Sequence, residues 1–217
     1  MKPGWIEDFP GFSSVRVLRT ARLEPVGQPT AVVLVGGTCA GKSTLAKALA
    51  LSSPRWSVAA RFTTRPSRGR DELEDTTVVS WAEFGDRYES GTFALAWERP
   101  MPDGTAIGYG CIQPSAGTTP IFVAGHGLYT NAASVRPKDA LSSALIVGVL
   151  APERVRRVRL KSRSADLDPN LTRALLAHDD QAMLAAADIV VDNYGDHEAT
   201  AARDFISAVT SIVGEEQ

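Results

Sequence analysis

The sequence is poor in cysteine, because its 217 residues include only Cys39 and Cys111. Two thiols that stand far apart do not make the disulfide framework of a small secreted domain, so we expect both to be reduced. The chain also lacks a run of about 20 apolar residues that could span a membrane. Its first ten residues lack the basic start and apolar centre of a secretory signal. These absences predict a cytoplasmic protein with no membrane partner.

The chain has no large excess of charge of either sign. It carries 23 Lys+Arg and 25 Asp+Glu, a formal net charge of -2, so we expect no nucleic-acid partner that binds through bulk charge. The three histidines lie far apart and show no metal-ligand spacing. The basic residues instead gather in two windows, which hold Arg61, Arg65, Arg68 and Arg70, and then Arg154, Arg156, Arg157, Arg159, Lys161 and Arg163. Each window is either solvated surface or an anion-binding device.

Strand and helix patterns alternate along most of the chain. Short apolar runs at 31–35, 57–62, 120–124, 144–150 and 189–191 predict buried strands, and helical patterns follow at 43–51, 153–162, 168–186 and 197–213. Repeated strand–helix–strand units indicate an α/β fold, in which a parallel sheet carries helices on both faces.

Two parts of the chain fall outside this alternation. Residues 1–29 contain four prolines and are predicted to be an N-terminal arm, in which 15–18 could form a short edge strand. This arm could dock on the body or on a second subunit, so a homodimer is one option for assembly. Residues 64–112 are polar and turn-rich, with a helix at 81–89 and Ser80 as its N-cap. We therefore predict a core of 30–63 and 113–217 and an inserted subdomain at 64–112.

A phosphate-binding loop follows the first core strand. Gly36-Gly37-Thr38-Cys39-Ala40-Gly41-Lys42-Ser43 fits the pattern G-x-x-x-x-G-K-[ST] at every required position. Backbone N–H groups of such a loop cradle phosphates, Lys42 reaches the β- and γ-phosphates, and the Ser43 hydroxyl ligates Mg²⁺. Thr44 is a candidate near the α-phosphate or an ordinary first-turn residue. The loop predicts the three-layer P-loop NTPase fold with ATP and Mg²⁺ as cofactors, and the guanine-reading N-K-x-D motif of GTPases is absent.

The first arginine window begins a set of motifs that resembles a known group. The set comprises Thr63-Thr64-Arg65-Pro66-Ser67-Arg68, Val79-Ser80, Glu83-Phe84, Gly91-Thr92-Phe93, Trp97 and Tyr109-Gly110. It resembles the acceptor-binding subdomain of the guanylate kinase superfamily of P-loop kinases. Within that superfamily, Phe93-Ala94-Leu95-Ala96-Trp97 and the spacing of Glu72 look more like ribose 1,5-bisphosphate phosphokinase. The resemblance covers roughly residues 31–213.

The resemblance implies roles for residues on the acceptor side. Arg65 and Arg68 would hold the acceptor's phosphate through their guanidinium groups, and the Tyr109 hydroxyl would help. Glu72 would lie near the acceptor's polar groups or the metal, although a surface carboxylate is the alternative. His126 lies where an acceptor could be met, but we expect a loop or core histidine.

The resemblance also implies a helical lid near 159–173, in which Arg163 and Arg173 stabilise the moving charge together with Lys42. Asn193 could touch the adenine base or be a plain turn residue. In the second arginine window Arg159 could face the active site. The remaining arginines of that helix, Arg154, Arg156 and Arg157, are expected on a solvated face.

Several departures weaken an assignment to GMP. Thr76 follows Asp75 where guanylate kinases have a phosphate-binding tyrosine, and their guanine-reading glutamate falls at Ala96. The third core strand leads into Ala124 rather than into an acid, and the stretch between Trp97 and Tyr109 is longer than in either relative. We therefore predict an ATP-dependent kinase for a small phosphorylated acceptor, ribose 1,5-bisphosphate phosphokinase-like. The alternatives are a nucleoside monophosphate kinase, a specialised-metabolite kinase and a non-catalytic nucleotide-binding scaffold.

Overall fold

The computed structural model describes residues 7–8, 15–17, 29–65, 76–101, 103–114, 116–125, 128, 143–163, 172, 176, 185–193 and 198–213. Several residues singled out by the sequence, Arg68, Arg70, Glu72, Asp75, His126 and Arg173, lie outside this set, as does most of the helix predicted at 168–186. Arg163 ends a described helix, but only its backbone belongs to the description.

A seven-stranded sheet runs through the described part of the chain in the order β1-β2-β11-β10-β3-β9-β4. Its parallel strands are β3 (Val32–Val35), β4 (Trp56–Val58), β9 (Thr119–Val123), β10 (Leu145–Leu150) and β11 (Ile189–Asp192). The predicted parallel sheet is confirmed. β2 (Val15–Val17) pairs antiparallel with β11 and β1 (Glu7–Asp8) pairs with β2, so the short edge strand expected at 15–18 is present.

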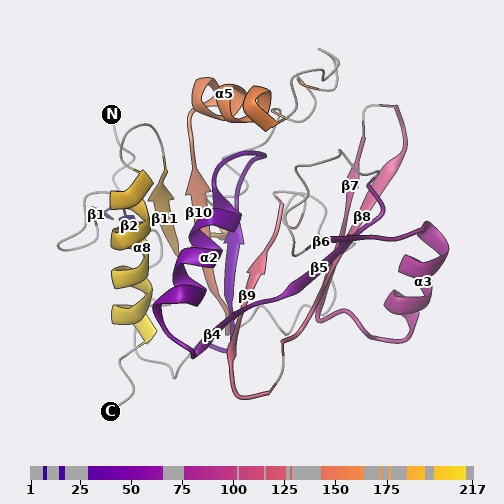
Figure 1. Ribbon diagram of the computed structural model, residues 1–217, viewed down its shortest axis with the longest axis horizontal. Coiled ribbons are helices and arrows are strands. Elements are labelled where there is room, and N and C mark those ends of the chain that lie inside the picture. The colour runs from indigo at the N-terminus through magenta and orange to yellow at the C-terminus, as the bar shows by residue number, and fades with distance from the viewer. Residues whose placement is uncertain are drawn as a thin grey trace.

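Two helices cover one face of this sheet (Figure 1). They are α2 (Lys42–Ser52) and α8 (Glu198–Val213). Leu45 and Leu49 of α2 and Phe205 of α8 are buried with the side chains that β3, β10 and β11 direct toward them. Alternate residues of the same strands are buried on the opposite face, because successive side chains of a strand point to opposite sides. The helix α5 (Glu153–Arg163) follows β10 and lies beyond its carboxyl end (Figure 1).

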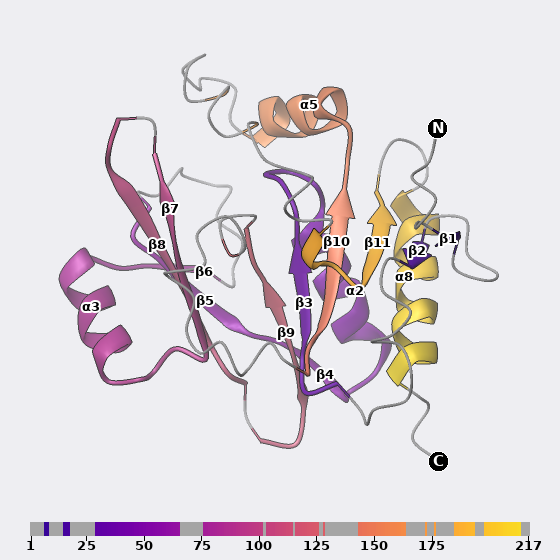
Figure 2. The same ribbon diagram turned by 180° about the vertical axis from the view of Figure 1, so that it is seen from behind.

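A second sheet stands beside the first, as Figures 1 and 2 show from opposite sides. Its order is β6-β5-β8-β7, with β5 at Ala60–Thr63, β6 at Thr76–Val78, β7 at Leu95–Pro100 and β8 at Ala106–Ile112. The strand expected over 57–62 is therefore divided. Residues 56–58 pair with β9, Ala59 donates its N–H to Ile121, and residues 60–63 pair with β8. The same apolar run thus serves two sheets.

The two faces of the second sheet have different neighbours. The helix α3 (Trp81–Glu89) packs on the outer face, where Phe84 meets Phe93 with ring centroids 5.0 Å apart. On the inner face, Leu95, Trp97 and Cys111 are buried together with Phe122 and Ala124 at the carboxyl end of β9. This packing presents the inner face of the second sheet to the edge where the parallel strands end.

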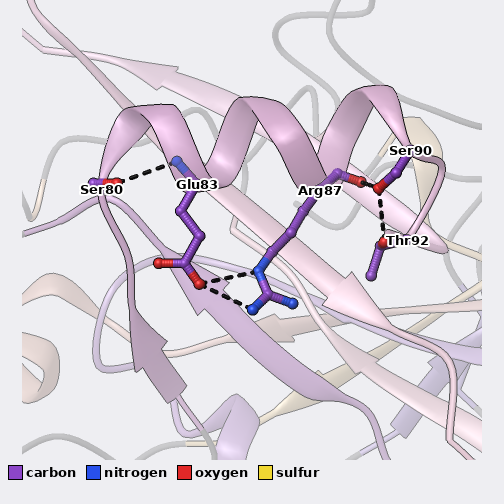
Figure 3. Close-up of polar contacts among 5 residues, drawn as sticks. All are labelled: Ser80, Glu83, Arg87, Ser90 and Thr92. Carbon is purple, nitrogen blue, oxygen red and sulfur yellow. Dashed lines mark hydrogen bonds and ion pairs between the residues drawn. The ribbon is translucent and has the colours of Figure 1, made fainter.

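The predicted N-cap of α3 is confirmed. The Ser80 hydroxyl accepts a hydrogen bond from the Glu83 N–H at 3.1 Å, and the Glu83 carboxylate pairs with Arg87 one turn later at 2.9 Å (Figure 3). The hydroxyl therefore satisfies one of the backbone donors that the first turn leaves open.

Replacing Ser80 with alanine is expected to lower the free energy of unfolding by about 1 kcal/mol, because this donor loses its partner. Urea denaturation followed by circular dichroism measures the change. Ser80→Asp is the matched control, since an aspartate keeps an acceptor at the cap and should retain the stability. Equal losses in both variants would contradict the assigned role of the hydroxyl.

Candidate active site

The loop at 36–43 curls around backbone positions that only particular residues tolerate. Gly36 and Gly41 have φ of 153° and 98°, and Cys39 has φ of 61°. A Cβ at Gly36 would lie 2.4 Å from the Val149 carbonyl oxygen, and one at Gly41 would lie 2.0 Å from Asn193 Nδ2. Both glycines are thus required by conformation and by space. The loop joins the end of β3 to the first turn of α2, which is the context that phosphate binding needs.

Lys42 turns its ammonium group back into the loop. Its Nζ donates to the carbonyl oxygens of Gly36 at 2.9 Å and Gly37 at 2.8 Å. Burial first, and then the charges of Arg61 and Arg99, lower the pKa of Lys42 from 10.5 to about 7. A phosphate anion beside the ammonium would favour its charged form. The protonation state of Lys42 near neutral pH therefore depends on whether an anion is bound beside it.

ATP binding is expected to be accompanied by proton uptake at pH 8. The free protein then holds Lys42 largely neutral, and the bound triphosphate recharges it, so about one proton should enter per ATP bound. Titration calorimetry with Mg²⁺ and ATP in two buffers of different ionisation enthalpy measures this number. Lys42→Arg is the control, because a guanidinium stays charged throughout. Binding enthalpies that do not depend on the buffer in the unsubstituted protein would contradict the prediction.

Asn193, which directly follows β11, and Arg159 of α5 bind the backbone of the loop. The Asn193 side chain donates from Nδ2 to the Ala40 carbonyl oxygen at 2.8 Å. The Arg159 guanidinium donates from Nη1 to the carbonyl oxygens of Cys39 and Asn193, both at 3.3 Å. Arg159 thus faces the loop, as the sequence allowed. Contact of Asn193 with the adenine base stays a prediction.

The expectation that Arg156 lies on a solvated helix face is wrong. Arg156 is only 2% exposed, and it donates from Nε to Ala151 O and from Nη1 to Leu176 O, each at 3.1 Å. These carbonyl groups compensate for the burial of its charge. Arg154 and Arg157 are exposed as expected, and Arg157 pairs with Glu153. The second arginine window therefore contains one buried arginine that is hydrogen-bonded to the backbone, and other arginines that are exposed to solvent.

Of the first arginine window, the structure describes Arg61, which lies on the second sheet, and Arg65, which follows its strand β5. Arg61 of β5 donates from Nη2 and Nε to the Thr76 hydroxyl at 2.7 and 3.0 Å. Arg65 follows β5, its N–H is bound by the Thr63 hydroxyl at 3.1 Å, and its Nε is buried without a hydrogen-bond partner in the described part of the chain. Tyr109 stands opposite Thr63 on β8. Arg65 thus follows, by two residues, the position that pairs with Tyr109, while the phosphate-binding roles of both stay predictions.

Tyr109 stacks on Trp97, with ring centroids 5.3 Å apart and planes 11° from parallel. The Trp97 Nε1 atom lies 3.8 Å from the place where a Cβ on Gly125 would stand, one residue after Ala124. An indole and a phenol therefore occupy the region after β9, where Ala124 supplies no acid.

Sequence reasoning gave no task to two arginines near this place. Arg61 and Arg99 both act on the pKa of Lys42, although they come from different strands of the second sheet. The sequence did contain a pattern that indicates the place of Arg99. Arg99 stands two residues after Trp97, so in a strand both side chains lie on the same face. Placing Arg99 beside Tyr109 also requires the register between β7 and β8, which the sequence does not show.

The described residues fit a magnesium ion that is held mainly by phosphate and water oxygens, with Ser43 as the one protein ligand. Ser43 opens the first turn of α2, and no group of three His, Cys, Asp or Glu side chains able to hold a metal exists among the residues that the structure describes. Mg²⁺ commonly keeps several waters and phosphate oxygens as ligands, so a single hydroxyl is compatible with it. Within the same part of the chain, no helix is both long and apolar enough to cross a membrane.

Comparison with known proteins is informative at the level of structure. No protein-family model and no curated protein matches the sequence. A guanylate kinase from Anaplasma phagocytophilum has a similar structure, with a TM-score of 0.54, 17% identity, and 87% of this chain and 89% of that chain covered. A gluconokinase from Sinorhizobium meliloti 1021 is less similar in structure, with a TM-score of 0.42 and 12% identity over 86% of this chain and 95% of that one. The chain thus has an α/β fold like that of the guanylate kinase, with five parallel strands flanked by helices.

Proposed function

We propose that the protein is an ATP-dependent kinase that transfers the γ-phosphoryl group to a small phosphorylated acceptor. The observation that carries this is the meeting of a complete phosphate loop with a basic face of the second sheet. Arg61 and Arg99 are close enough to the loop lysine to change its pKa. Two anionic molecules, a triphosphate and an acceptor, suit such an arrangement of cations.

In the proposed reaction, the phosphate loop binds ATP and the basic face of the second sheet binds the acceptor. The γ-phosphoryl group leaves the oxygen that stays with ADP and bonds to an oxygen of the acceptor, so the products are ADP and an acceptor with one more phosphoryl group. Lys42 would neutralise charge on the transferred group, and Arg163 and Arg173 would join it from the lid. Mg²⁺, held by Ser43 and phosphate oxygens, would supply further charge neutralisation when bound.

The surroundings of Ala124 favour a phosphate as the attacking group. An acceptor hydroxyl needs a base to take its proton, whereas a phosphate oxygen is already anionic. Ala124 and Gly125 follow β9 without an acidic side chain, and Trp97 fills the adjacent space. We therefore favour an acceptor that is attacked through its phosphate, which includes nucleoside monophosphates.

Two acceptor classes remain in this proposal. A ribose 1,5-bisphosphate phosphokinase-like activity is favoured by the side chains, because Ala96 packs with Phe84 and Phe93 instead of offering a base-reading carboxylate. A guanylate-type activity is favoured by the structural similarity to a guanylate kinase across most of both chains.

The test is a panel of phosphorylated acceptors incubated with ATP and Mg²⁺ and analysed by the mass of the product. The expected result is an acceptor that gains one phosphoryl group while an equal amount of ADP forms. Arg154→Gln, a change on the exposed side of α5, is the control and should leave the rate unchanged. ATP binding without turnover in the presence of every acceptor would instead support a nucleotide-binding scaffold.

A further inference from the structure

Arg99 stands on the inner face of the second sheet, beside the aromatic pair. In the β7–β8 ladder Trp97 is opposite Tyr109 and Arg99 is opposite Ile107. Since side chains two residues apart on a strand share a face, Arg99 projects on the side where Trp97 stacks against Tyr109. This is the face that packs against the carboxyl end of β9.

The end of the hairpin that carries Arg99 is held by its own hydrogen bonds. The Met101 N–H donates to Thr105 O at 2.8 Å, and the Asp103 carboxylate accepts from both the Thr105 N–H at 3.0 Å and the Thr105 hydroxyl at 2.6 Å. The ladder continues to the pair Pro100 and Ala106. The backbone of Arg99 is therefore held to β8 by ladder pairs both before and after it in β7.

The surroundings of Arg99 bring like charges together. Burial lowers the pKa of Arg99, the charge of Arg65 lowers it further, and Tyr109 acts in the opposite direction. Arg99 also lowers the pKa of Lys42. Cations that are close to one another and withdrawn from water destabilise the free protein, and an anion between them removes that cost.

Arg65 offers a second observation at the same place. Its Nε is a buried donor with no hydrogen-bond partner among the residues that the structure describes. A buried donor without a partner costs free energy, and a ligand oxygen would relieve it. Arg99 is thus close to both Arg65 and Tyr109, and the two guanidinium groups and the phenol hydroxyl can all donate hydrogen bonds.

We propose that Arg99 is a further acceptor-binding residue, which holds a phosphate group of the acceptor together with Arg65 and Tyr109. The inference rests on the proposed kinase function, and it deepens that function by adding a residue from the β7–β8 hairpin to the acceptor site. Phosphate is the ligand because two guanidinium forks and a hydroxyl match its several oxygens.

The kinetic test compares Arg99→Gln with the unsubstituted protein on the acceptor found in the screen. The Michaelis constant for the acceptor is expected to rise about 10- to 100-fold, the range for losing hydrogen bonds to a charged group, with the constant for ATP unchanged. Arg99→Lys should lie between them, because lysine keeps the charge without the fork. Arg87→Gln is the control for charge, since Arg87 lies on α3 across the sheet. An unchanged constant for the acceptor in Arg99→Gln would overturn the inference.

A binding measurement separates this inference from the kinase proposal. With the phosphate loop filled by Mg²⁺ and a non-hydrolysable ATP analogue, inorganic phosphate is titrated and its dissociation constant is determined by calorimetry. Arg99→Gln should weaken phosphate binding about 10-fold or more, whether or not any acceptor is turned over. If Arg99→Gln fails to fold, Arg99→Lys serves in its place with a smaller expected loss. Equal phosphate affinity in the variant, or no phosphate binding in the unsubstituted protein, would overturn the assignment of Arg99.

Discussion

Replacing Lys42 with methionine is expected to lower the rate of phosphoryl transfer by at least about 100-fold, because the charge that meets the transferred group is lost. Methionine is also unbranched and is only one atom shorter than lysine, so the loop can retain its course. Burial already holds the pKa of Lys42 near about 7, and an uncharged side chain avoids this cost of desolvation. The midpoint of thermal unfolding should therefore not fall, and activity and stability should respond differently.

The measurement combines single-turnover transfer with thermal unfolding followed by circular dichroism. Lys161→Met is the control, because Lys161 is exposed on α5 and its replacement removes the same charge away from the loop. We expect that variant to retain its activity. Transfer by Lys42→Met at more than about a tenth of the unsubstituted rate would remove Lys42 from the chemistry.

The substitution of Gly41 by alanine is expected to abolish tight nucleotide binding and to lower the free energy of unfolding by about 2 kcal/mol or more. Its Cβ would lie 2.0 Å from Asn193 Nδ2, at a backbone φ of 98° that L side chains rarely adopt. Asn193 cannot withdraw without giving up its 2.8 Å hydrogen bond to Ala40. Urea denaturation and titration with a fluorescent ATP analogue measure the two effects.

Gly85 offers a matched control for the same chemical change. It lies inside α3, and a Cβ there would meet nothing within 4 Å. Gly85→Ala should stabilise the protein by up to about 1 kcal/mol, because glycine is a poor helix former. Adding Asn193→Ala to Gly41→Ala removes the clash but leaves the backbone strain, so stability should recover only in part. A Gly41→Ala protein as stable as the unsubstituted one would show that the loop can rearrange.

The central sheet and the loop were accessible from the sequence because their signals are local. The apolar run at β3, the glycines after it and the first turn of α2 are contiguous, and each specifies its own conformation. The N-cap at Ser80 was predictable for the same reason. In these segments the residues that determine the structure are also neighbours in the chain.

Other features depend on partners far away in the sequence. The run at 57–62 looks continuous, and only its pairing with β9 and β8 shows that Ala59 divides it. Arg156 is buried because it binds a carbonyl group 20 residues later, at Leu176. The place of Arg99 depends on the register of the β7–β8 ladder. Composition and periodicity do not specify such pairings.

The division of one strand at Ala59 has a mechanical consequence for the acceptor side. The chain crosses between the sheets at Ala59, and it returns between Ile112 and Thr119, beside the same place. A rotation about this joint would leave the hydrogen bonds within both sheets intact, but it would have to shift Leu95, Trp97 and Cys111 against Phe122 and Ala124. Arg99 is paired four ladder positions beyond Leu95, or about 13 Å further out. A turn of about 10° would move its backbone by about 2 Å relative to the pivot, given that arm. The outer end of the hairpin would thus travel furthest toward or away from the loop, carrying an anion-binding side chain with it.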